Sequence, residues 1–514
     1  MAPPQELDAV KQNGSTNGTS HDNKVCTADK LKTASAKQPQ VHVASVANGS
    51  QGPVKILPNV LHNIGKTPLI RLNRIPQSFG IECEVLAKCE LFAPGGSHKD
   101  RIAVRMIEEA EADGRLKPGY TVIEPTSGNT GISVAMVCAV KGYKCILVMP
   151  EKMSAEKHWT MNRLGATVVR CPNNIVHTTV ADKIHRETPN SIILDQYGNE
   201  ANPRVHYEET TEEILEQCDG KLDMIVIGVG TGGAVTGIGR KIKEKCPSCP
   251  VIGIDPVGST MALPESLNSG PGFFEVEGIG HTWLPDCLDR SVIDKWIKVS
   301  DKDTFNMARR IISEEGLLVG GSCGTAVVGA IQAIKEAGLG KGQRCVIIFP
   351  DSVRNYMTKF LSDQWMLERA FLPDSEVSLG YSWWNKTVAE LKLESPLTVV
   401  PDLTVGNAVK LMKEKKQNQV AVVSSQGSIQ GVLSLEHLLK QLISLNITSS
   451  TKVESVVNGQ FKRITLFDTL GKLTYILQGT PFALVVKEEK NGNVLVSEKL
   501  LGIATQMDLA TFIL

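Results

Sequence analysis

Residues 85–114 read VLAKCELFAPGGSHKDRIAVRMIEEAEADG, and this stretch contains the unit from which the fold is built. Its first five residues are mostly apolar and predict a buried strand, after which a glycine pair turns the chain. From Lys99 onward, apolar residues recur at helical spacing until Gly114 ends the pattern, which predicts a helix over 99–113. The apolar positions are Ala103, Met106, Ile107 and Ala110.

The same unit recurs along most of the chain. From about residue 53 to residue 363, short runs rich in valine and isoleucine alternate with segments of helical length. These runs begin at Thr121, Cys145, Ala166, Ile192, Met224, Val251 and Cys345. The alternation predicts an α/β fold of parallel sheets with helices on both faces. Roughly 300 residues are enough for two such lobes, and we expect a ligand cleft between them.

The chain repeats itself after about residue 390. The run at 420–423, followed by 431–438, is matched by the run at 482–486, followed by 502–509. A period of roughly 65 residues that holds a strand, a helix, two strands and a helix predicts a duplicated small α/β unit. Because two copies are too few for a solenoid, we expect a pseudo-symmetric pair.

The predicted plan has four parts. Residues 1–53 contain no aromatic residue and no isoleucine, which predicts a flexible tail. The other parts are a two-lobed core at 54–371, a linker at 372–390 and a domain pair at 391–514, with repeats at about 391–446 and 450–514.

Composition places the chain among ordinary globular proteins. Of its 514 residues, 42% are hydrophobic and 21% are charged, and 55 basic side chains balance 55 acidic ones. This balance favours neither nucleic acid nor an anionic membrane as a partner. We find no apolar run typical of a membrane span or a secretory signal. The 12 cysteines are scattered, as in proteins of a reducing compartment, so we expect a cytoplasmic protein.

One cysteine pair, Cys246 and Cys249, forms the motif C-P-S-C. The motif is compatible with a redox site or with half of a zinc site, but the sequence has no second pair of residues at the spacing that zinc ligands require. Because the pair lies in a proline-rich turn before a strand, we interpret it as two inert surface thiols.

Three loops between a strand and a helix carry residues suited to chemistry. In the first, GGSHKDR at 95–101, Lys99 opens the predicted helix, where the macrodipole disfavours a cation. Its ammonium form is therefore destabilised, as an imine-forming amine requires. A solvated lysine after a turn is the alternative.

The other two loops are suited to anions. PTSGNTG at 125–131 offers hydroxyls and backbone N–H groups to a carboxylate, and GVGTGG at 228–233 suits a phosphate. A single glycine-rich loop also serves as a tight turn, but three such loops after separate strands are stronger evidence. An amine, a carboxylate site and a phosphate site together indicate pyridoxal phosphate acting on an amino acid.

These motifs resemble the β-family, or fold type II, of pyridoxal-phosphate enzymes. The strings that carry the resemblance are KCELFAPGGSHKDR, PTSGNTG, GVGTGG and GGSCG. The strings ILDQY, EVEGIG and FPDSVRNYMTKFLSD are similar to the cystathionine β-synthases of animals, of the insect-like type. The C-terminal repeat resembles the paired, Bateman-type CBS domains of that family. Nearly the whole chain after residue 53 is covered.

The resemblance implies a set of site residues. Lys99 is the Schiff-base lysine and catalytic base, Asn129 hydrogen-bonds the pyridoxal 3′-oxygen, and Ser322 faces the pyridine nitrogen. The phosphate loop comprises Gly230, Thr231, Gly232, Gly233 and Ala234, with Ala234 where a hydroxyl is expected. The substrate-binding residues are Thr126, Ser127, Thr130, Gln196 and Tyr197, with Gly278 and Gly280 on a mobile loop that closes the cleft.

The resemblance also implies the reaction. A neutral partner for the ring nitrogen makes the cofactor a weaker electron sink, which favours loss of a β-leaving group over transamination. L-Serine and L-homocysteine then give L-cystathionine and water, a transsulfuration step, and cysteine as a substrate releases hydrogen sulfide. A cysteine synthase that uses O-acetylserine and sulfide shares these residues and is one alternative. A catalytically inactive nucleotide sensor built on the C-terminal repeat is another. A homodimer follows from the resemblance alone.

For the tail, the resemblance implies haem b held by a cysteine thiolate and a histidine. Cys26 is the cysteine of the tail, and His42 matches the family order better than His21. Arg240 matches the position of the cation that moderates the thiolate charge. Val25 stands where the family pattern has a basic residue. The alternative is a tail that binds no haem, in which the Cys26 thiol has no function.

For the C-terminal pair, the resemblance implies clefts for S-adenosylmethionine, in which an Asp at the start of each repeat's last helix accepts the ribose hydroxyls. The second repeat has Thr505 and Asp508, whereas the first has Ser434 and His437 at the equivalent positions. Ser424 stands where the family has an acidic residue. We therefore predict that S-adenosylmethionine binds weakly or not at all.

Overall fold

The computed structural model describes most of the chain after residue 55. The described residues are 56–126, 128–150, 153–171, 177–268, 272–372, 381–444, 447–459, 461–491 and 494–514. The predicted tail at 1–53 and the loop residue Ser127 lie outside them. Within the described ranges, no helix is long and apolar enough to cross a membrane.

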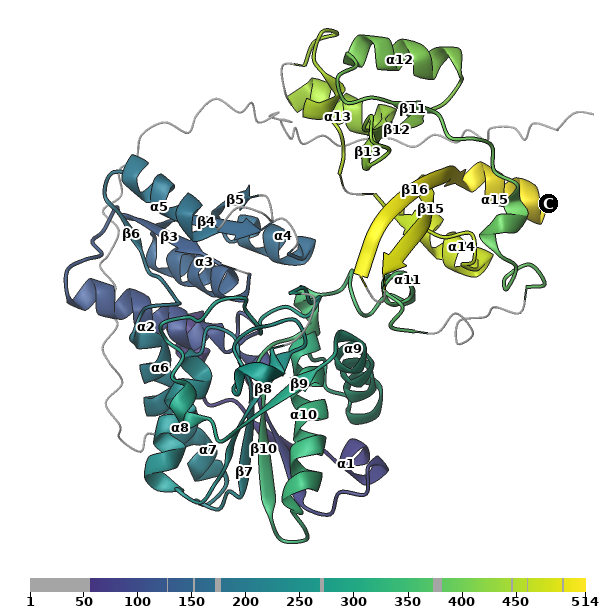
Figure 1. The fold of residues 1–514 in the computed structure, drawn as a ribbon. Helices are drawn as coiled ribbons and strands as arrows, with labels where there is room; N and C mark the ends of the chain where they lie inside the picture. The colour runs from purple at the N-terminus through teal and green to yellow at the C-terminus, as the bar shows by residue number, and fades with distance from the viewer. Residues whose placement is uncertain are drawn as a thin grey trace, which may run out of the picture. The chain divides into compact units, whose positions relative to one another are not determined.

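The larger sheet of the core has six strands in the order β1-β2-β10-β7-β8-β9 (Figure 1). Their bounds are β1 (Leu69–Arg71), β2 (Glu84–Cys89), β7 (Met224–Gly228), β8 (Val251–Pro256), β9 (Lys295–Val299) and β10 (Arg344–Phe349). Neighbouring strands are parallel, except for the antiparallel pair β1 and β2. Alternate strand residues pack against α10 (Gly321–Ala337) on one face and α8 (Gly233–Lys245) on the other.

The smaller sheet of the core has four parallel strands in the order β5-β4-β3-β6. Their bounds are β3 (Thr121–Pro125), β4 (Lys144–Pro150), β5 (Thr167–Cys171) and β6 (Ser191–Ile193). One face packs against α2 (Lys99–Ala112) and α3 (Asn129–Lys141), and the other against α5 (His177–Glu187). The apolar positions predicted for α2 are all buried here, so α2 belongs to the core of the smaller lobe.

The two-lobed α/β core with parallel sheets is confirmed, together with the predicted strands and the helix that begins at Lys99. The strands β1 and β9 have no counterpart in the sequence prediction. Both lie at edges of the larger sheet, and β9 carries Lys295 and Lys298, so its apolar signal is weak. Further helices of the described core are α1 (Arg74–Ser78), α4 (Ala155–Arg163), α6 (Ala201–Val205), α7 (Thr211–Gln217), α9 (Asp301–Arg310) and α11 (Asp363–Glu368).

The C-terminal repeat forms two three-stranded sheets, β11-β12-β13 and β14-β15-β16. The first unit is β11 (Thr398–Val399), α12 (Val405–Glu414), β12 (Gln419–Val423), β13 (Ile429–Ser434) and α13 (Leu435–Ser444). The second is β14 (Arg463–Ile464), α14 (Leu470–Gly479), β15 (Phe482–Asn491), β16 (Val494–Thr505) and α15 (Gln506–Ile513). Each sheet has one parallel and one antiparallel pair, in the predicted order of elements, so the duplicated α/β unit is confirmed.

Residues that precede the first repeat pack on the second. Val388 is fully buried in a cluster with residues of α14 and β15, and Thr387 forms a bridge with Thr469. The indole of Trp384 lies against Gly471, where an added Cβ would come within 2.4 Å of the ring nitrogen. Residues of the predicted linker therefore complete the core of the second repeat.

Candidate active site

Lys99 is the first residue of α2 and is only 7% exposed. Its Nζ lies 3.4 Å from the Thr231 hydroxyl, in the loop between β7 and α8. The pocket around this amine is lined by residues that include His98, Lys99, Gly230, Thr231, Gly232 and Gly278. The first and third predicted loops, which are 132 residues apart at this contact, therefore meet in one pocket.

Burial lowers the pKa of Lys99 to about 8. The nearby Cys287, Asp351 and Glu124 act in the opposite direction, but desolvation outweighs them. A pKa near 8 keeps a usable fraction of the amine neutral at physiological pH. The predicted destabilisation of the ammonium thus has burial as its main cause.

The glycines of the third loop leave no room for side chains. A Cβ on Gly230 would lie 2.4 Å from the carbonyl oxygen of Gly278, and one on Gly233 would lie 2.0 Å from Asn202 Oδ1. Gly232 has a φ of +86°, in the left-handed region that favours glycine. The backbone can therefore approach a ligand closely at the N-terminus of α8, whose free N–H groups suit an anion.

The residues around this cradle fit the phosphate of pyridoxal phosphate. Asn202 Nδ2 donates to Thr231 Oγ1 at 3.1 Å and to the carbonyl of Gln196 at 2.8 Å, which fixes the loop. Ala234 lines the pocket but has no hydroxyl, so the cradle is made of backbone groups and Thr231. A buried amine that also lines this pocket completes the donor set for an aldehyde cofactor.

The second predicted loop lies between β3 and α3. Thr126 Oγ1 accepts from the backbone N–H groups of Gly128 at 3.0 Å and Gly131 at 3.1 Å, so this hydroxyl shapes the loop itself. Thr130 Oγ1 donates to Gln196 Oε1 at 2.6 Å. The structure therefore brings Thr126, Thr130 and Gln196 together, while Ser127 is not described.

Glu124 holds Gln196 in place and has no counterpart in the sequence prediction. Its carboxyl oxygens accept from the backbone N–H groups of Asp195 at 2.9 Å and Gln196 at 3.1 Å. Burial raises the pKa of Glu124 to about 8. A glutamate inside the apolar pattern of β3 gives no local signal that its partners lie more than 70 residues away.

Asn129 is fixed at both ends of its amide. Its Nδ2 donates to Asp351 Oδ2 at 2.7 Å, and its Oδ1 accepts from Asn355 Nδ2 at 3.0 Å. Neither partner was predicted from the sequence. A signal was present, because Asp351 lies two residues after the carboxyl end of β10, where parallel strands of α/β sheets place ligand-binding residues.

The other predicted residues are buried but do not line the pocket around Lys99. Ser322 lies in the first turn of α10 and is 2% exposed. The ring of Tyr197 is approached by those of His281 and Trp283, with centroids 5.6 and 5.0 Å away. Gly280 has a φ of +80°, and its N–H donates to the carbonyl of Val229 at 2.8 Å. This bond and the Gly278 contact hold residues 278–280 against the glycine cradle.

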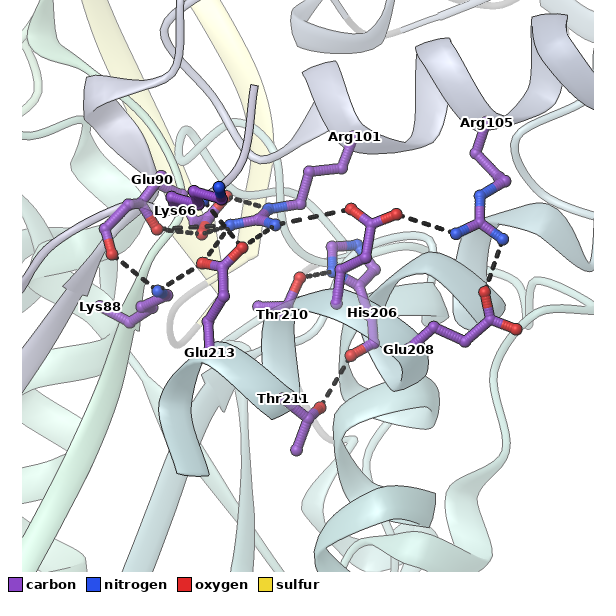
Figure 2. Close-up of polar contacts among 12 residues, drawn as sticks. Lys66, Lys88, Glu90, Arg101, Arg105, His206, Glu208, Thr210, Thr211 and Glu213 are labelled. Atoms are coloured by element: carbon purple, nitrogen blue, oxygen red, sulfur yellow. Dashed lines mark hydrogen bonds and ion pairs between the residues drawn. The ribbon is translucent and has the colours of Figure 1, made fainter. Parts of the chain in front are cut away.

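A buried ion cluster surrounds Arg101, two residues along α2 from Lys99 (Figure 2). Arg101 donates to Glu90 at 2.8 and 2.9 Å and to Glu213 at 2.7 and 2.8 Å. Lys88 also donates to Glu213, at 2.7 Å. The Arg101 and Glu90 side chains are fully buried. The cluster therefore joins the start of α2 to β2 and α7.

The thiols of C-P-S-C are free. Burial raises the pKa of Cys249 to about 12, so this thiol stays protonated. The expectation of two surface thiols is wrong for Cys249, which is 1% exposed because it packs in the apolar cluster between the larger sheet and α8. In the described part of the chain, no group of three or more histidine, cysteine or acidic side chains is placed to hold a metal ion.

The predicted haem ligands Cys26 and His42 lie outside the described residues. Their expected partner Arg240 is described: its side chain is 48% exposed and forms an ion pair with Asp289 at 3.1 Å.

The predicted regulatory residues act as helix caps. Thr505 Oγ1 accepts from the backbone N–H of Asp508, and Asp508 Oδ2 accepts from both the hydroxyl and the N–H of Thr505. In the first repeat, Ser434 Oγ accepts from the N–H of His437 at 3.2 Å. The two repeats thus share the cap, but only the second one supplies a carboxylate at this position.

Comparison with known proteins decides the family. Residues 60–351 match the family described as pyridoxal-phosphate dependent enzyme, and residues 388–444 match the CBS domain. The chain is 51% identical to the cystathionine β-synthase of Oryctolagus cuniculus, over 89% of this chain and 85% of that one. It is 44% identical to the cystathionine β-synthase of Apis mellifera, over 92% and 93%. This chain belongs to the cystathionine β-synthase family.

Membership of this family makes the chain a pyridoxal-phosphate-dependent enzyme of β-replacement, and not a sensor without catalytic activity. The core is also similar to the O-acetylserine-dependent cystathionine β-synthase of Helicobacter pylori, with a TM-score of 0.56 and 33% identity over 60% of this chain and 99% of that one. A hydrogen sulfide-producing enzyme of Fusobacterium nucleatum has a TM-score of 0.55 and 35% identity, over 59% and 100%.

Proposed function

We propose that this enzyme condenses L-serine with L-homocysteine to give L-cystathionine and water. The observation that carries the proposal is the buried Lys99 amine, which shares its pocket with a glycine cradle. The 44–51% identity to animal cystathionine β-synthases supports this substrate pair.

Bound pyridoxal phosphate supplies an electron sink for negative charge at the substrate Cα. In the proposal, Lys99 would hold the cofactor, and its neutral amine would accept the α-proton of serine. The same amine then protonates the departing hydroxyl, so that water leaves from Cβ. A pKa near 8 suits both steps, because the group must take and return a proton near neutral pH. The homocysteine sulfur would then bond to Cβ, and the proton that the thiol gives up would pass through the Lys99 amine to Cα.

The remaining assignments follow the same proposal. The cradle of Gly230, Thr231, Gly232, Gly233 and Ala234 binds the phosphate, and Asn129 and Ser322 contact the ring. Thr126, Thr130 and Gln196, with Ser127, bind the substrate carboxylate. Tyr197 lies beside the ring, and Gly278 and Gly280 belong to the closing loop.

O-Acetylserine is the second candidate donor, since a solved relative is described as O-acetylserine dependent. Mass spectrometry of the products distinguishes the donors and acceptors. We expect cystathionine from serine plus homocysteine. The proposal would be contradicted if O-acetylserine gave product and serine gave none. It would also be contradicted if cysteine formed from O-acetylserine and sulfide faster than cystathionine formed from serine and homocysteine. We also propose that cysteine replaces serine with release of hydrogen sulfide.

We further propose that the tail binds haem b through Cys26 and His42. Arg240 supports this proposal, because its half-exposed guanidinium, paired with one carboxylate, has donors left for a thiolate. We expect a Soret band in full-length protein expressed with haem supply, and its loss or shift in Cys26→Ala. An unchanged band in that variant would refute Cys26 as a ligand.

For the C-terminal pair, we propose at most one weak site for S-adenosylmethionine. One oxygen of Asp508 already accepts two hydrogen bonds from Thr505, which leaves the other for a ribose. Ser424 stands where the family has an acidic residue. Losing such a charge-assisted contact costs about 1.5–3 kcal/mol of binding free energy, or one to two powers of ten in Kd. Calorimetry should show weak or no binding and little activation. Tight binding with activation lost in Asp508→Ala would overturn this.

The domain plan of tail 1–53, core 54–371, linker 372–390 and pair 391–514 remains a proposal. So do a homodimer, to be checked by light scattering, and a cytoplasmic location, which the free thiols among the described cysteines support.

A further inference from the structure

Asp351 is a buried carboxylate at the carboxyl end of the larger sheet. It follows β10 by two residues and is 1% exposed. Its backbone carbonyl accepts from the N–H of Gly320 at 2.9 Å, which fixes it beside the start of α10. It also forms an isolated bridge with Ser97, two residues before Lys99. This carboxylate therefore lies among the segments that carry the predicted cofactor residues.

Both hydrogen bonds of the Asp351 carboxylate fall on one oxygen. Oδ2 accepts from Asn129 Nδ2 at 2.7 Å and from the Tyr356 hydroxyl. Among the described residues, Oδ1 has no hydrogen-bond partner, and it packs so tightly on Gly320 that a Cβ there would lie 2.0 Å away. Because a buried polar atom without a partner is costly, the site needs a reason to keep a carboxylate.

The reason lies in the amide that Asp351 holds. Asn355 Nδ2 donates to Asn129 Oδ1 at 3.0 Å, so the two ends of the Asn129 amide face an acceptor and a donor. Rotating this amide by half a turn would set two oxygens against each other at Asp351 and two NH₂ groups against each other at Asn355. The orientation of the Asn129 amide is thus fixed by charge as well as by shape.

The fixed amide has one hydrogen left. Nδ2 carries two, of which one goes to Asp351. The same nitrogen lies 3.9 Å from the position of a Cβ on Gly278, a residue that lines the pocket. A donor of known orientation therefore stands beside the pocket. A reversed amide would present a carbonyl oxygen there and would repel an oxygen of the cofactor ring.

We propose that Asp351 is a positioning residue, which holds the Asn129 amide so that Nδ2 donates to the ring oxygen of pyridoxal phosphate. The inference rests on the proposed role of Asn129. Asp351 acts through Asn129 and does not touch the reacting atoms.

The test measures cofactor binding in the full-length enzyme without substrate. In Asp351→Asn, we expect pyridoxal phosphate to bind about tenfold more weakly, with a shifted visible absorbance of the bound cofactor. Asn129→Ala should give the same kind of shift. The double variant should be no worse than the more affected single variant, because both changes act on the same contact, between Asp351 and the Asn129 amide. A wild-type spectrum in Asp351→Asn, or fully additive losses, would overturn the inference.

Asp255→Asn is the matched control. Asp255 is also fully buried, has one oxygen without a hydrogen-bond partner in the described ranges, and accepts from Lys298 through the other at 2.8 Å. This change should lower thermal stability and leave the cofactor spectrum unchanged. If Asp255→Asn shifted the spectrum as much as Asp351→Asn does, general destabilisation would explain both shifts. That result would refute the positioning role.

Asn355→Ala tests the other end of the amide if Asp351→Asn does not fold. It should shift the spectrum in the same direction but less, and an unchanged spectrum would overturn the inference. These measurements do not depend on the substrate pair. If wild-type enzyme makes no cystathionine from serine and homocysteine, the proposed substrates fail while the spectral result stands. If Asn129→Ala has no effect, the Asn129 assignment and the inference fail together.

Discussion

The Lys99 amine is nearly buried beside the Thr231 hydroxyl, so its surroundings determine its protonation. The motif around Lys99 and the two anion loops could be recognised from the sequence, because each follows a strand and carries unusual residues at close spacing. The place of Asp351 after β10 marked it as a candidate, but the contacts of Glu124 and Asp351 could not be assigned in this way. Their partners lie 71 and 222 residues away, and no local pattern specifies such a contact.

Replacing Lys99 with alanine should abolish β-replacement and leave pyridoxal phosphate bound without a covalent link. The amine is the nucleophile and the base in the proposed mechanism, and Ala cannot replace either role. Borohydride reduction followed by peptide mapping should label Lys99 in the wild type and no residue in the variant. A label on another lysine would contradict the assignment.

The pKa of Lys99 also predicts a pH dependence in cofactor-free protein. The folded-state pKa of about 8 lies below the ordinary value of 10.5, so the unfolded chain binds more protons between these values. The free energy of unfolding should therefore rise as the pH rises from about 8 to about 10.5, by up to about 3 kcal/mol. Urea unfolding at both ends of this window measures the effect. The same slope in Lys99→Met would refute Lys99 as its source.

At the scale of elements, the ion cluster of Arg101, Glu90, Glu213 and Lys88 fixes the start of α2 against β2 and α7 (Figure 2). The apolar spacing of α2 was sufficient to predict that helix. The cluster was not predictable, because Arg101 and Glu213 are 112 residues apart and each appears as an ordinary charge on a helix. The edge strands β1 and β9 were missed for the related reason that edges tolerate polar residues.

Glu213→Gln should destabilise the core by about 2–4 kcal/mol at pH 7, because it leaves the buried Arg101 and Lys88 with less negative charge. Burial raises the pKa of Glu213, but the hydrogen bonds and charges of Arg101 and Lys88 outweigh it and lower the pKa to about 2. A depressed carboxyl pKa gives stability above about pH 4.5 that is lost as the pH falls toward 2. The difference between variant and wild type should therefore shrink in acid.

Urea titrations at pH 7 and pH 3 measure this difference. Glu216→Gln, an exposed change on the same helix α7, is the control and should alter stability by less than about 0.5 kcal/mol. An equal loss in both variants, or no dependence on pH, would contradict the role of the cluster.

At the scale of the whole molecule, order along the chain differs from order in space. The 65-residue period predicted both C-terminal units. It did not predict that Trp384 and Val388, which precede the first unit, pack into the second, because the partner residues are more than 70 positions away. A sequence repeat identifies the elements that both units have in common, and it gives no information on contacts made by residues outside the repeat.

Trp384→Ala should lower the free energy of unfolding of the second repeat by about 3–5 kcal/mol, and its midpoint temperature with it. The change removes a buried aromatic side chain that packs on Gly471. The cofactor lies in the core, so its visible absorbance should be kept at temperatures where tryptophan fluorescence already reports unfolding. Tyr381→Ala, at a position 55% exposed, should change little. Loss of both signals at one lowered temperature would contradict this picture.

The placement of α2 has a mechanical consequence. Lys99 begins a helix whose apolar face is part of the smaller lobe, whereas the glycine cradle belongs to the larger sheet and α8. In the proposed site, a cofactor attached at Lys99 and bound in the cradle would therefore link the two separately packed lobes. Its removal should free the lobes to separate, and cofactor-free enzyme should be cut faster by a dilute protease than loaded enzyme. Pyridoxal phosphate would then connect the two lobes as well as take part in the reaction.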